Sequence, residues 1–277
     1  MKQKIDLPKP PDEMVAYYKA MDAFIRNQTN NLKLITMYHL EAIDQFIKGM
    51  KKDTSLLEEG CVAIDNVQVA GNFKQLVELL SNSSTDNHLA EQLRRSVEDN
   101  QWDANFWNDS IEKIEQKIIT LAEEMSIDVH SLLQLAYWSM SPYWRLAAHI
   151  HKEALNNMGT NERDTCPICG KHADFALLDD NEHGRRYLVC LHCDFKWPFK
   201  RIGCSYCGNE DYQKLGYILI DNVEGYKVYH CEVCKTYLKT FDQRADVPSL
   251  SDSMMLVNVE TLFLDIVATE KGYRPMR

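Results

Sequence analysis

This chain of 277 residues has no long hydrophobic run and no excess of positive charge, and glycine is rare in its first 161 residues. The most apolar late stretch, residues 254–268, is interrupted by Asn258, Glu260 and Asp265 and is too short to span a bilayer, which predicts no stable membrane insertion. The formal charge of −10 repels phosphate, so nucleic acid and anionic lipid are poor default partners. The N-terminus has no apolar segment typical of a secretory signal. We therefore expect a cytoplasmic protein whose thiols stay reduced.

The first part of the chain, residues 1–161, has the composition and periodicity of helices. It contains three glycines before Gly159, and apolar residues recur in it at helical spacing. Asp103 and Asp128 are typical helix starts, and Pro142 predicts a kink or a split in the helix that follows Asp128. We expect five to seven helices with a core of their own. The expected helical stretches are 15–26, 32–51, 73–80, 104–125 and 131–158.

The second part, residues 162–244, loses this periodicity and carries short β-prone runs between pairs of cysteines. The runs are 175–178, 187–189, 217–220 and 226–229, and turn signals flank them, so each half reads as a small β-hairpin unit. Residues 249–271 then return to a helical pattern. The predicted fold class is α+β with several domains: an α-helical domain at 1–161, zinc-ribbon-like β modules at 162–203 and 204–244, and a C-terminal helix at 245–277.

The cysteines carry the clearest functional signal. Eight of the nine form four Cys-x-x-Cys pairs, separated by 20, 10 and 23 residues. Two such pairs joined by a hairpin of about 20 residues are typical of a four-cysteine metal site. Sequential pairing is favoured because each half has its own hairpin; the alternative interleaves first with third and second with fourth. The predicted ligands are Cys166, Cys169, Cys190 and Cys193 in site 1, and Cys204, Cys207, Cys231 and Cys234 in site 2.

The predicted cofactors are two metal ions, iron or zinc. A tetrahedron of four thiolates suits both metals by geometry, and it leaves no open position for hydrolysis. A structural role is favoured, since the region is too small to hold a core alone; a redox role needs iron. The sequence contains no phosphate-binding loop, nucleophile elbow or zincin motif. We therefore predict a non-enzyme.

Other residues beside the cysteines admit two interpretations. Cys61 lies in a helical context and is interpreted as a free thiol. Because each site already has four cysteines, His172, His192 and His230 are expected to surround the sites rather than bind the metal. A basic cluster follows the first hairpin turn and is either a solvated face or a docking patch for an acidic segment. The candidate partner-binding residues are Arg185, Arg186, Trp197, Lys200 and Arg201.

Motifs beyond the cysteines resemble the formate dehydrogenase accessory protein FdhE family, over residues 165 to 275. Arg186-Tyr187-Leu188 leads into the second cysteine pair, and Trp197 and Arg201 stand between the second and third pairs. After the fourth pair come Tyr237-Leu238-Lys239-Thr240, then Leu264-Asp265 and Gly272-Tyr273.

The resemblance implies a helical N-terminal domain followed by two rubredoxin-like modules. It implies a non-enzymatic assembly factor that binds the catalytic subunit of a molybdenum- or tungsten-dependent formate dehydrogenase; a homo-oligomer is left open. One alternative is a rubredoxin-like iron electron-transfer protein. A nucleic-acid-binding zinc ribbon is a weaker one, because residues 162–244 lack a basic stripe. A thiol–disulfide oxidoreductase is disfavoured, because no βαβ pattern surrounds a cysteine pair.

Overall fold

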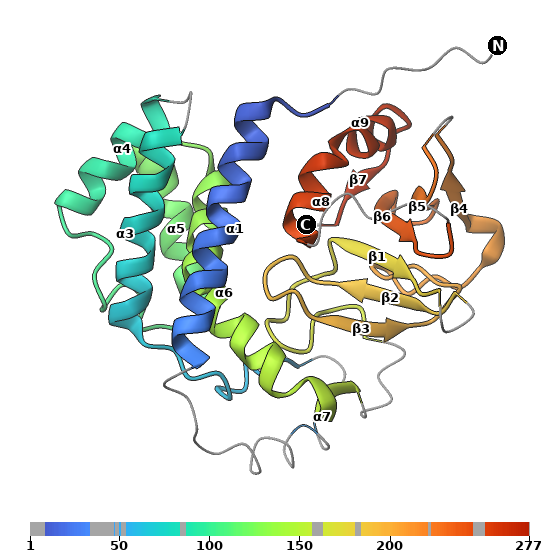
Figure 1. Cartoon of the computed structure of the whole chain (residues 1–277), viewed down its shortest axis with the longest axis horizontal. Coiled ribbons are helices and arrows are strands. Elements are labelled where there is room, and N and C mark those ends of the chain that lie inside the picture. Colours follow the sequence, from blue (N-terminus) through green and yellow to red (C-terminus); the bar gives the residue numbers. More distant parts are fainter. Residues whose placement is uncertain are drawn as a thin grey trace.

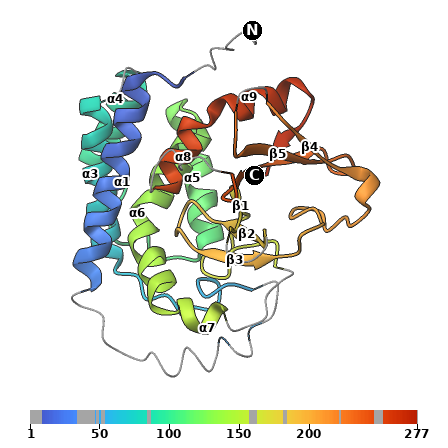
Figure 2. The same ribbon diagram turned by 45° about the vertical axis from the view of Figure 1, so that its right-hand side comes forward.

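The computed structural model describes residues 9–33, 47, 50, 54–83, 87–156, 163–180, 184–220, 223–245 and 253–276. Helices gather on one side of the molecule and a twisted sheet on the other, in both views (Figures 1 and 2). The first side contains α1 (Asp12–Lys33), α3 (Asn66–Ser83), α4 (Asn87–Glu98), α5 (Ile111–Met125), α6 (Val129–Ile150) and α7 (Lys152–Asn156). Most of the helix expected at 32–51, and the stop expected at Gly159, lie outside the described residues.

The central helix of this layer is α6, which packs against α1, α3 and α5. It begins where the sequence predicts, because the side chain of Asp128 accepts a hydrogen bond from the backbone N–H of Ser131 at 2.7 Å. Of the kink or split expected at Pro142, the split is wrong: one helix continues through the proline to Ile150. All residues from 138 to 148 are buried, so packing on every side holds the helix together despite the missing hydrogen bond.

The helix expected at 104–125 begins later than the apolar pattern predicts. The carboxylate of Asp103 accepts the backbone N–H groups of Asn105 and Phe106, each at 3.0 Å, and so closes a turn rather than a helix. Helix α5 begins only at Ile111 and buries Ile114, Ile118 and Ala122 at helical spacing. Helix α4 was not predicted by the sequence pattern.

A single sheet contains both cysteine-bounded halves. Its order is β3-β2-β1-β6-β5-β4, with β7 beside β6. Each half is an antiparallel set of three strands, and a parallel pairing of β1 with β6 joins the halves. The four predicted β runs are confirmed, with shifted ends in three. The strands are β1 (Phe175–Leu178), β2 (Arg186–Val189), β3 (Lys196–Phe199), β4 (Leu215–Ile218), β5 (Tyr226–Cys231), β6 (Thr236–Asp242) and β7 (Arg274–Pro275), with a 3₁₀ turn at Tyr212–Lys214 before β4.

The C-terminal helix is divided at Thr261 into α8 (Met254–Glu260) and α9 (Leu262–Glu270). The first piece packs against α1 and the second against β5, β6 and β7, so the pair bridges helices and sheet. One apolar core runs from the helices to the cysteines of site 1, and a second lies between the sheet and α9. The α+β fold class is confirmed. Within the described residues, none of the helices combines the length and apolarity needed to cross a bilayer.

Candidate metal centres

All four Cys-x-x-Cys turns end in a residue of the same backbone conformation. The residue after the second cysteine is left-handed in each, with φ of 75° at Gly170, 57° at Asp194, 72° at Gly208 and 57° at Lys235. In three of the turns the N–H of this residue donates to the carbonyl of the first cysteine, at 2.9 to 3.1 Å. The sequence indicates this conformation only where glycine stands, because other residues adopt it rarely.

The turns come together in the sequential pairing. The four sulfur atoms of each group lie within 4.8 Å of one another, and the interleaved arrangement is not formed. In site 1 the Sγ atoms of Cys166 and Cys193 are 3.3 Å apart and those of Cys169 and Cys190 are 3.5 Å apart. The corresponding separations in site 2 are 3.6 Å for Cys204 and Cys234 and 3.8 Å for Cys207 and Cys231. A tetrahedron with metal–sulfur bonds of about 2.3 Å requires about 3.8 Å, so each group could hold a metal ion.

Site 1 lies deep in the protein. Its four cysteines are each at most 3% exposed. The backbone N–H groups of Leu56 and Leu57 donate to the carbonyls of Pro167 and Ile168, inside the first turn, at 2.9 and 3.0 Å. Burial raises the pKa of the Cys169, Cys190 and Cys193 thiols. Four thiolates at this depth therefore require a cation to balance their charge.

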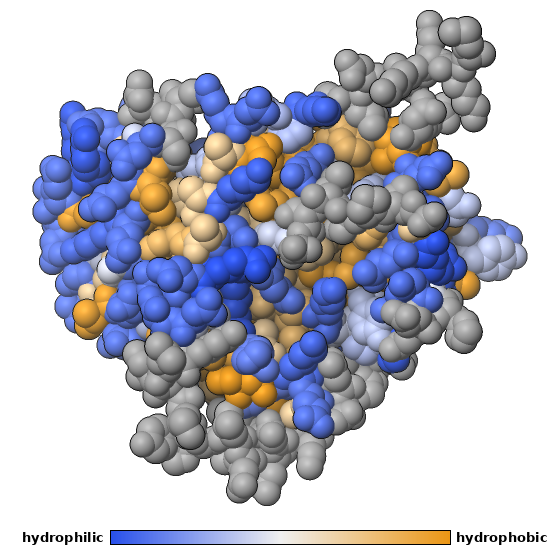
Figure 3. Space-filling view, in the orientation of Figure 1, coloured by the Kyte–Doolittle hydropathy of each residue, from blue (hydrophilic) through white to orange (hydrophobic). Residues whose placement is uncertain are grey.

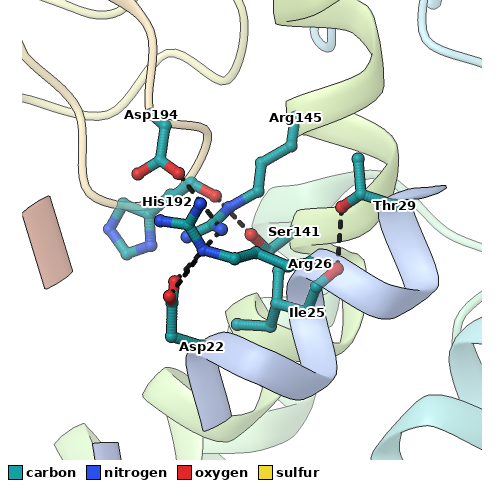
Figure 4. A network of polar contacts seen from close by, with 8 residues as sticks. All are labelled: Asp22, Ile25, Arg26, Thr29, Ser141, Arg145, His192 and Asp194. Atoms are coloured by element: carbon teal, nitrogen blue, oxygen red, sulfur yellow. Dashed lines mark hydrogen bonds and ion pairs between the residues drawn. The ribbon is translucent and has the colours of Figure 1, made fainter. Parts of the chain in front are cut away.

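A buried ion network fastens site 1 to the helices (Figure 4). Arg145 of α6 points between two carboxylates, and its Nη1 lies 3.3 Å from Asp22 Oδ1 of α1 and 3.1 Å from Asp194 Oδ2 of the second turn. Arg26 holds the other oxygen of Asp22 at 2.6 Å. Beside them, Ser141 of α6 donates to the carbonyl of His192. No local sequence pattern indicates this network, because its charges come from segments far apart in the chain.

Site 2 is more open than site 1. Cys204 and Cys231 are buried, whereas Cys207 is exposed and Cys234 is half-buried. Burial raises the pKa of the Cys234 thiol, but hydrogen bonds with Thr236 and then with Cys207 and Cys204 outweigh it, and the pKa falls to about 7. The Cys234 Sγ and Thr236 Oγ1 atoms are 3.0 Å apart. Within site 2, one sulfur thus has a lowered pKa while another faces solvent.

Residues near the sites that are not cysteines stay outside both sulfur groups. Cys61 is a free thiol apart from the clusters. No histidine among the described residues joins either group. The rings of His172, His192 and His230 instead pack against tyrosines, for example His230 against Tyr273 with ring centroids 4.3 Å apart.

The candidate partner-binding residues separate into different environments. Trp197 is 0% exposed and its indole N–H donates to the Arg163 carbonyl at 2.8 Å, so it offers no surface. Arg186 is 4% exposed. Arg185 and Arg201 are exposed, and Lys200 pairs with Glu210 at 2.5 Å.

Residues of the motifs that follow the fourth cysteine pair connect β6 with α8 and α9. Lys239 is 2% exposed, and its Nζ donates to Asp265 Oδ2 at 2.7 Å and to the Asn258 carbonyl at 2.8 Å. The Tyr237 hydroxyl donates to the other oxygen of Asp265 at 2.7 Å. Burial lowers the pKa of Lys239, and the Asp265 carboxylate opposes this shift. These side chains fix α9 on the sheet that contains the metal centres.

Comparison with known proteins finds similar sequences in proteins named as FdhE homologues. Residues 165–201, which contain all four cysteines of site 1, match the model described as FdhE, central domain. The "Protein FdhE homolog" of Aquifex aeolicus is 30% identical over 116 residues, 40% of this chain and 39% of that protein. That of Shewanella baltica is 27% identical over 150 residues, 53% of this chain and 48% of that protein. The chain spans less than half the length of these curated relatives.

A solved structure extends the comparison to the whole fold. The crystal structure of the FdhE protein from Pseudomonas aeruginosa matches with a TM-score of 0.53 at 18% identity, over 97% of this chain and 95% of that one. The match shows a shared fold. Together with the sequence matches, it confirms the resemblance that the motifs indicate.

Proposed function

Because this chain resembles the FdhE family through its metal-binding region, we propose that it is a non-enzymatic assembly or activation factor for a molybdenum- or tungsten-dependent formate dehydrogenase. It acts by binding the catalytic subunit of that enzyme in the cytoplasm. The observation that carries the proposal is the pair of four-cysteine groups in one sheet braced against a helical layer. Such an arrangement supplies a rigid surface.

Both groups are suited to holding structure rather than to hydrolysis. Each would surround one ion with four sulfurs, from Cys166, Cys169, Cys190 and Cys193 or from Cys204, Cys207, Cys231 and Cys234, and would leave no position for substrate. Zinc would staple the turns, and iron would add one-electron chemistry. The protein's own contribution is the turn geometry and, at site 1, exclusion of water.

Deletion of the gene tests the proposal. We expect the deletion strain to retain formate dehydrogenase polypeptide but to lose most of its activity. Wild-type protein and a Cys61→Ser variant should both restore activity, because Cys61 lies outside the metal centres. A Cys204→Ser/Cys207→Ser variant should not. Normal activity in the deletion strain would refute the proposal.

One observation, the exposure of Cys207, favours a second function, which is electron transfer. A solvent-facing sulfur beside an iron ion provides a route for electron transfer to a redox partner. Metal analysis of protein purified without oxygen decides between the two functions. Stoichiometric zinc with no visible absorption eliminates electron transfer, whereas iron with a reversible colour change on reduction supports it.

A further inference from the structure

A pocket of about 190 Å³ opens beside site 2, between the second hairpin and residues 201–205. Cys204 and Cys231 border it. No acidic side chain is found among the described residues that line it, whereas Arg186 and Arg201 both contribute. Its walls are otherwise mainly apolar or aromatic, from Ile202, Tyr212, Tyr217, Tyr229, Leu238 and Met276.

The unusual member of this lining is Arg186. Its side chain is buried, yet within the described part of the chain it makes one hydrogen bond, from Nη1 to the Gly203 carbonyl at 2.9 Å, and no ion pair. Its Nε is buried without a hydrogen-bond partner. The guanidinium lies 5.5 Å from the ring centre of Phe199 and 5.6 Å from that of Tyr229. A buried cation without a carboxylate is costly, so the site favours an anion.

Apolar surface continues past the mouth of the pocket. Ile202 is 59% exposed, Tyr212 71% and Tyr217 56%, and all three line the pocket. Leu219, two residues beyond Tyr217, is 63% exposed at the end of β4, the terminal strand of the sheet. Figure 3, in the orientation of Figure 1, shows polar side chains that separate apolar patches such as the one over α9. An inorganic anion would leave the apolar rim beside β4 uncovered, whereas a polypeptide segment would cover it.

We propose that this pocket receives an acidic side chain of a partner polypeptide. The carboxylate pairs with Arg186, and an apolar neighbour in the same segment packs on Tyr212 and Tyr217. The inference rests on the proposed function, because it specifies which side chains, one acidic and one apolar, the docking segment of the partner must contain. The net charge of −10 repels acidic segments elsewhere on the surface, so the pocket also provides selectivity.

Fluorescence anisotropy with the full-length, metal-loaded protein tests the proposal. The probes are a labelled Gly-Ser-Leu-Glu-Phe-Ser-Gly peptide and its counterpart with glutamine in place of glutamate, both blocked at their ends. We expect the glutamate peptide to bind at least about tenfold more tightly, because it forms a charged hydrogen bond that the amide cannot match. Arg186→Gln should abolish this difference, and Tyr217→Ser should weaken both peptides. Val233→Ser is the control, because Val233 is 59% exposed in the same module but does not line the pocket.

Three results would overturn the proposal. The first is equal binding of the two peptides. The second is inorganic phosphate binding as tightly as the glutamate peptide, which would make this a small-anion site. The third is evidence that Arg186 only balances the charge of the nearby thiolates. In that case the Arg186→Gln variant would lose the site 2 metal, whereas the Arg186→Lys variant would keep the metal and would bind both peptides equally. These results leave the deletion experiment untouched, and normal enzyme activity in a deletion strain would leave peptide binding untouched, so the two failures are distinguishable.

Discussion

Replacement of Arg145 by methionine should weaken the attachment of site 1 to the helical layer. Methionine keeps most of the aliphatic volume of the arginine but removes its charge. Asp22 would keep its contact with Arg26 at 2.6 Å. Asp194, whose side chain is 33% exposed, would lose the cation 3.1 Å from its Oδ2. Because Asp194 directly follows Cys193, one of the four cysteines of site 1, the loss should reach that site.

The magnitude follows from burial. The side chain of Arg145 is 6% exposed and that of Asp22 is 8% exposed. Removing one member of a fully buried ion pair costs about 3–5 kcal/mol. Since Asp22 retains Arg26 and Asp194 is partly solvated, we expect about 2–3 kcal/mol here. Asp22→Asn should cost less than Arg145→Met, and the double variant should cost less than the sum of the two.

Urea unfolding of the metal-loaded protein measures these differences. The control is Arg95→Met, which breaks an exposed pair with Glu91 in α4 and should cost less than about 1 kcal/mol. Release of metal to a chelator should also be faster from Arg145→Met than from the control. If Arg145→Met unfolds at the same urea concentration as Arg95→Met, the network does not join site 1 to the helices, and the reasoning is refuted.

Three further predictions concern the second half of the molecule. Because Cys207 is exposed, a chelator should remove the site 2 metal before the site 1 metal, and Cys207→Ser should bind one metal equivalent less than Cys61→Ser by elemental analysis. Asp265→Asn should lower the free energy of unfolding by about 1–3 kcal/mol, since it leaves the buried Lys239 ammonium without its carboxylate, as urea titration would show. Arg244 and Lys227 hold the pKa of Asp242 below its usual value, so Asp242 adds stability above about pH 4 that is lost as the pH falls further. The stability difference between wild type and Asp242→Asn should therefore shrink in acid.

Each of these has a contrary outcome. Simultaneous release of both metals would mean that exposure of Cys207 does not control exchange. An Asp265→Asn protein as stable as wild type would mean that Lys239 finds another partner or loses its proton. A difference between wild type and Asp242→Asn that stays constant from pH 7 to pH 3 would mean that Asp242 has an ordinary pKa.

The two four-cysteine groups could be predicted from the sequence almost completely, because residue type and spacing are local properties. Strand β1 was predicted with its bounds, since its apolar run ends at turn signals. Strand β3 was missed because it contains Pro198, which is tolerated there since β3 is the other terminal strand of the sheet. Strand β6 was missed because Lys239 makes it look solvated, and only the folded chain brings Asp265 to that lysine.

The network around Arg145 could not be predicted for the same reason. Asp22 and Arg145 are 123 residues apart, and nothing in either local sequence indicates a charged partner. A charged residue in an apolar helix is compatible with a surface position as well as with a buried pair. What decides between them is the packing of α1 on α6, a property of the assembled core.

The parallel pairing of β1 with β6 imposes an order on synthesis. The first three strands can pair with one another as soon as they leave the ribosome, but one edge of β1 stays open until residue 242 has been added. At about 5–20 residues per second, the 64 residues between the end of β1 and the end of β6 take roughly 3–13 s. During that interval the nascent chain presents the apolar edge of Phe175–Leu178 to its surroundings. Closure of the sheet is therefore a late event, and the newly made chain is most vulnerable to wrong pairing just before its second module is complete.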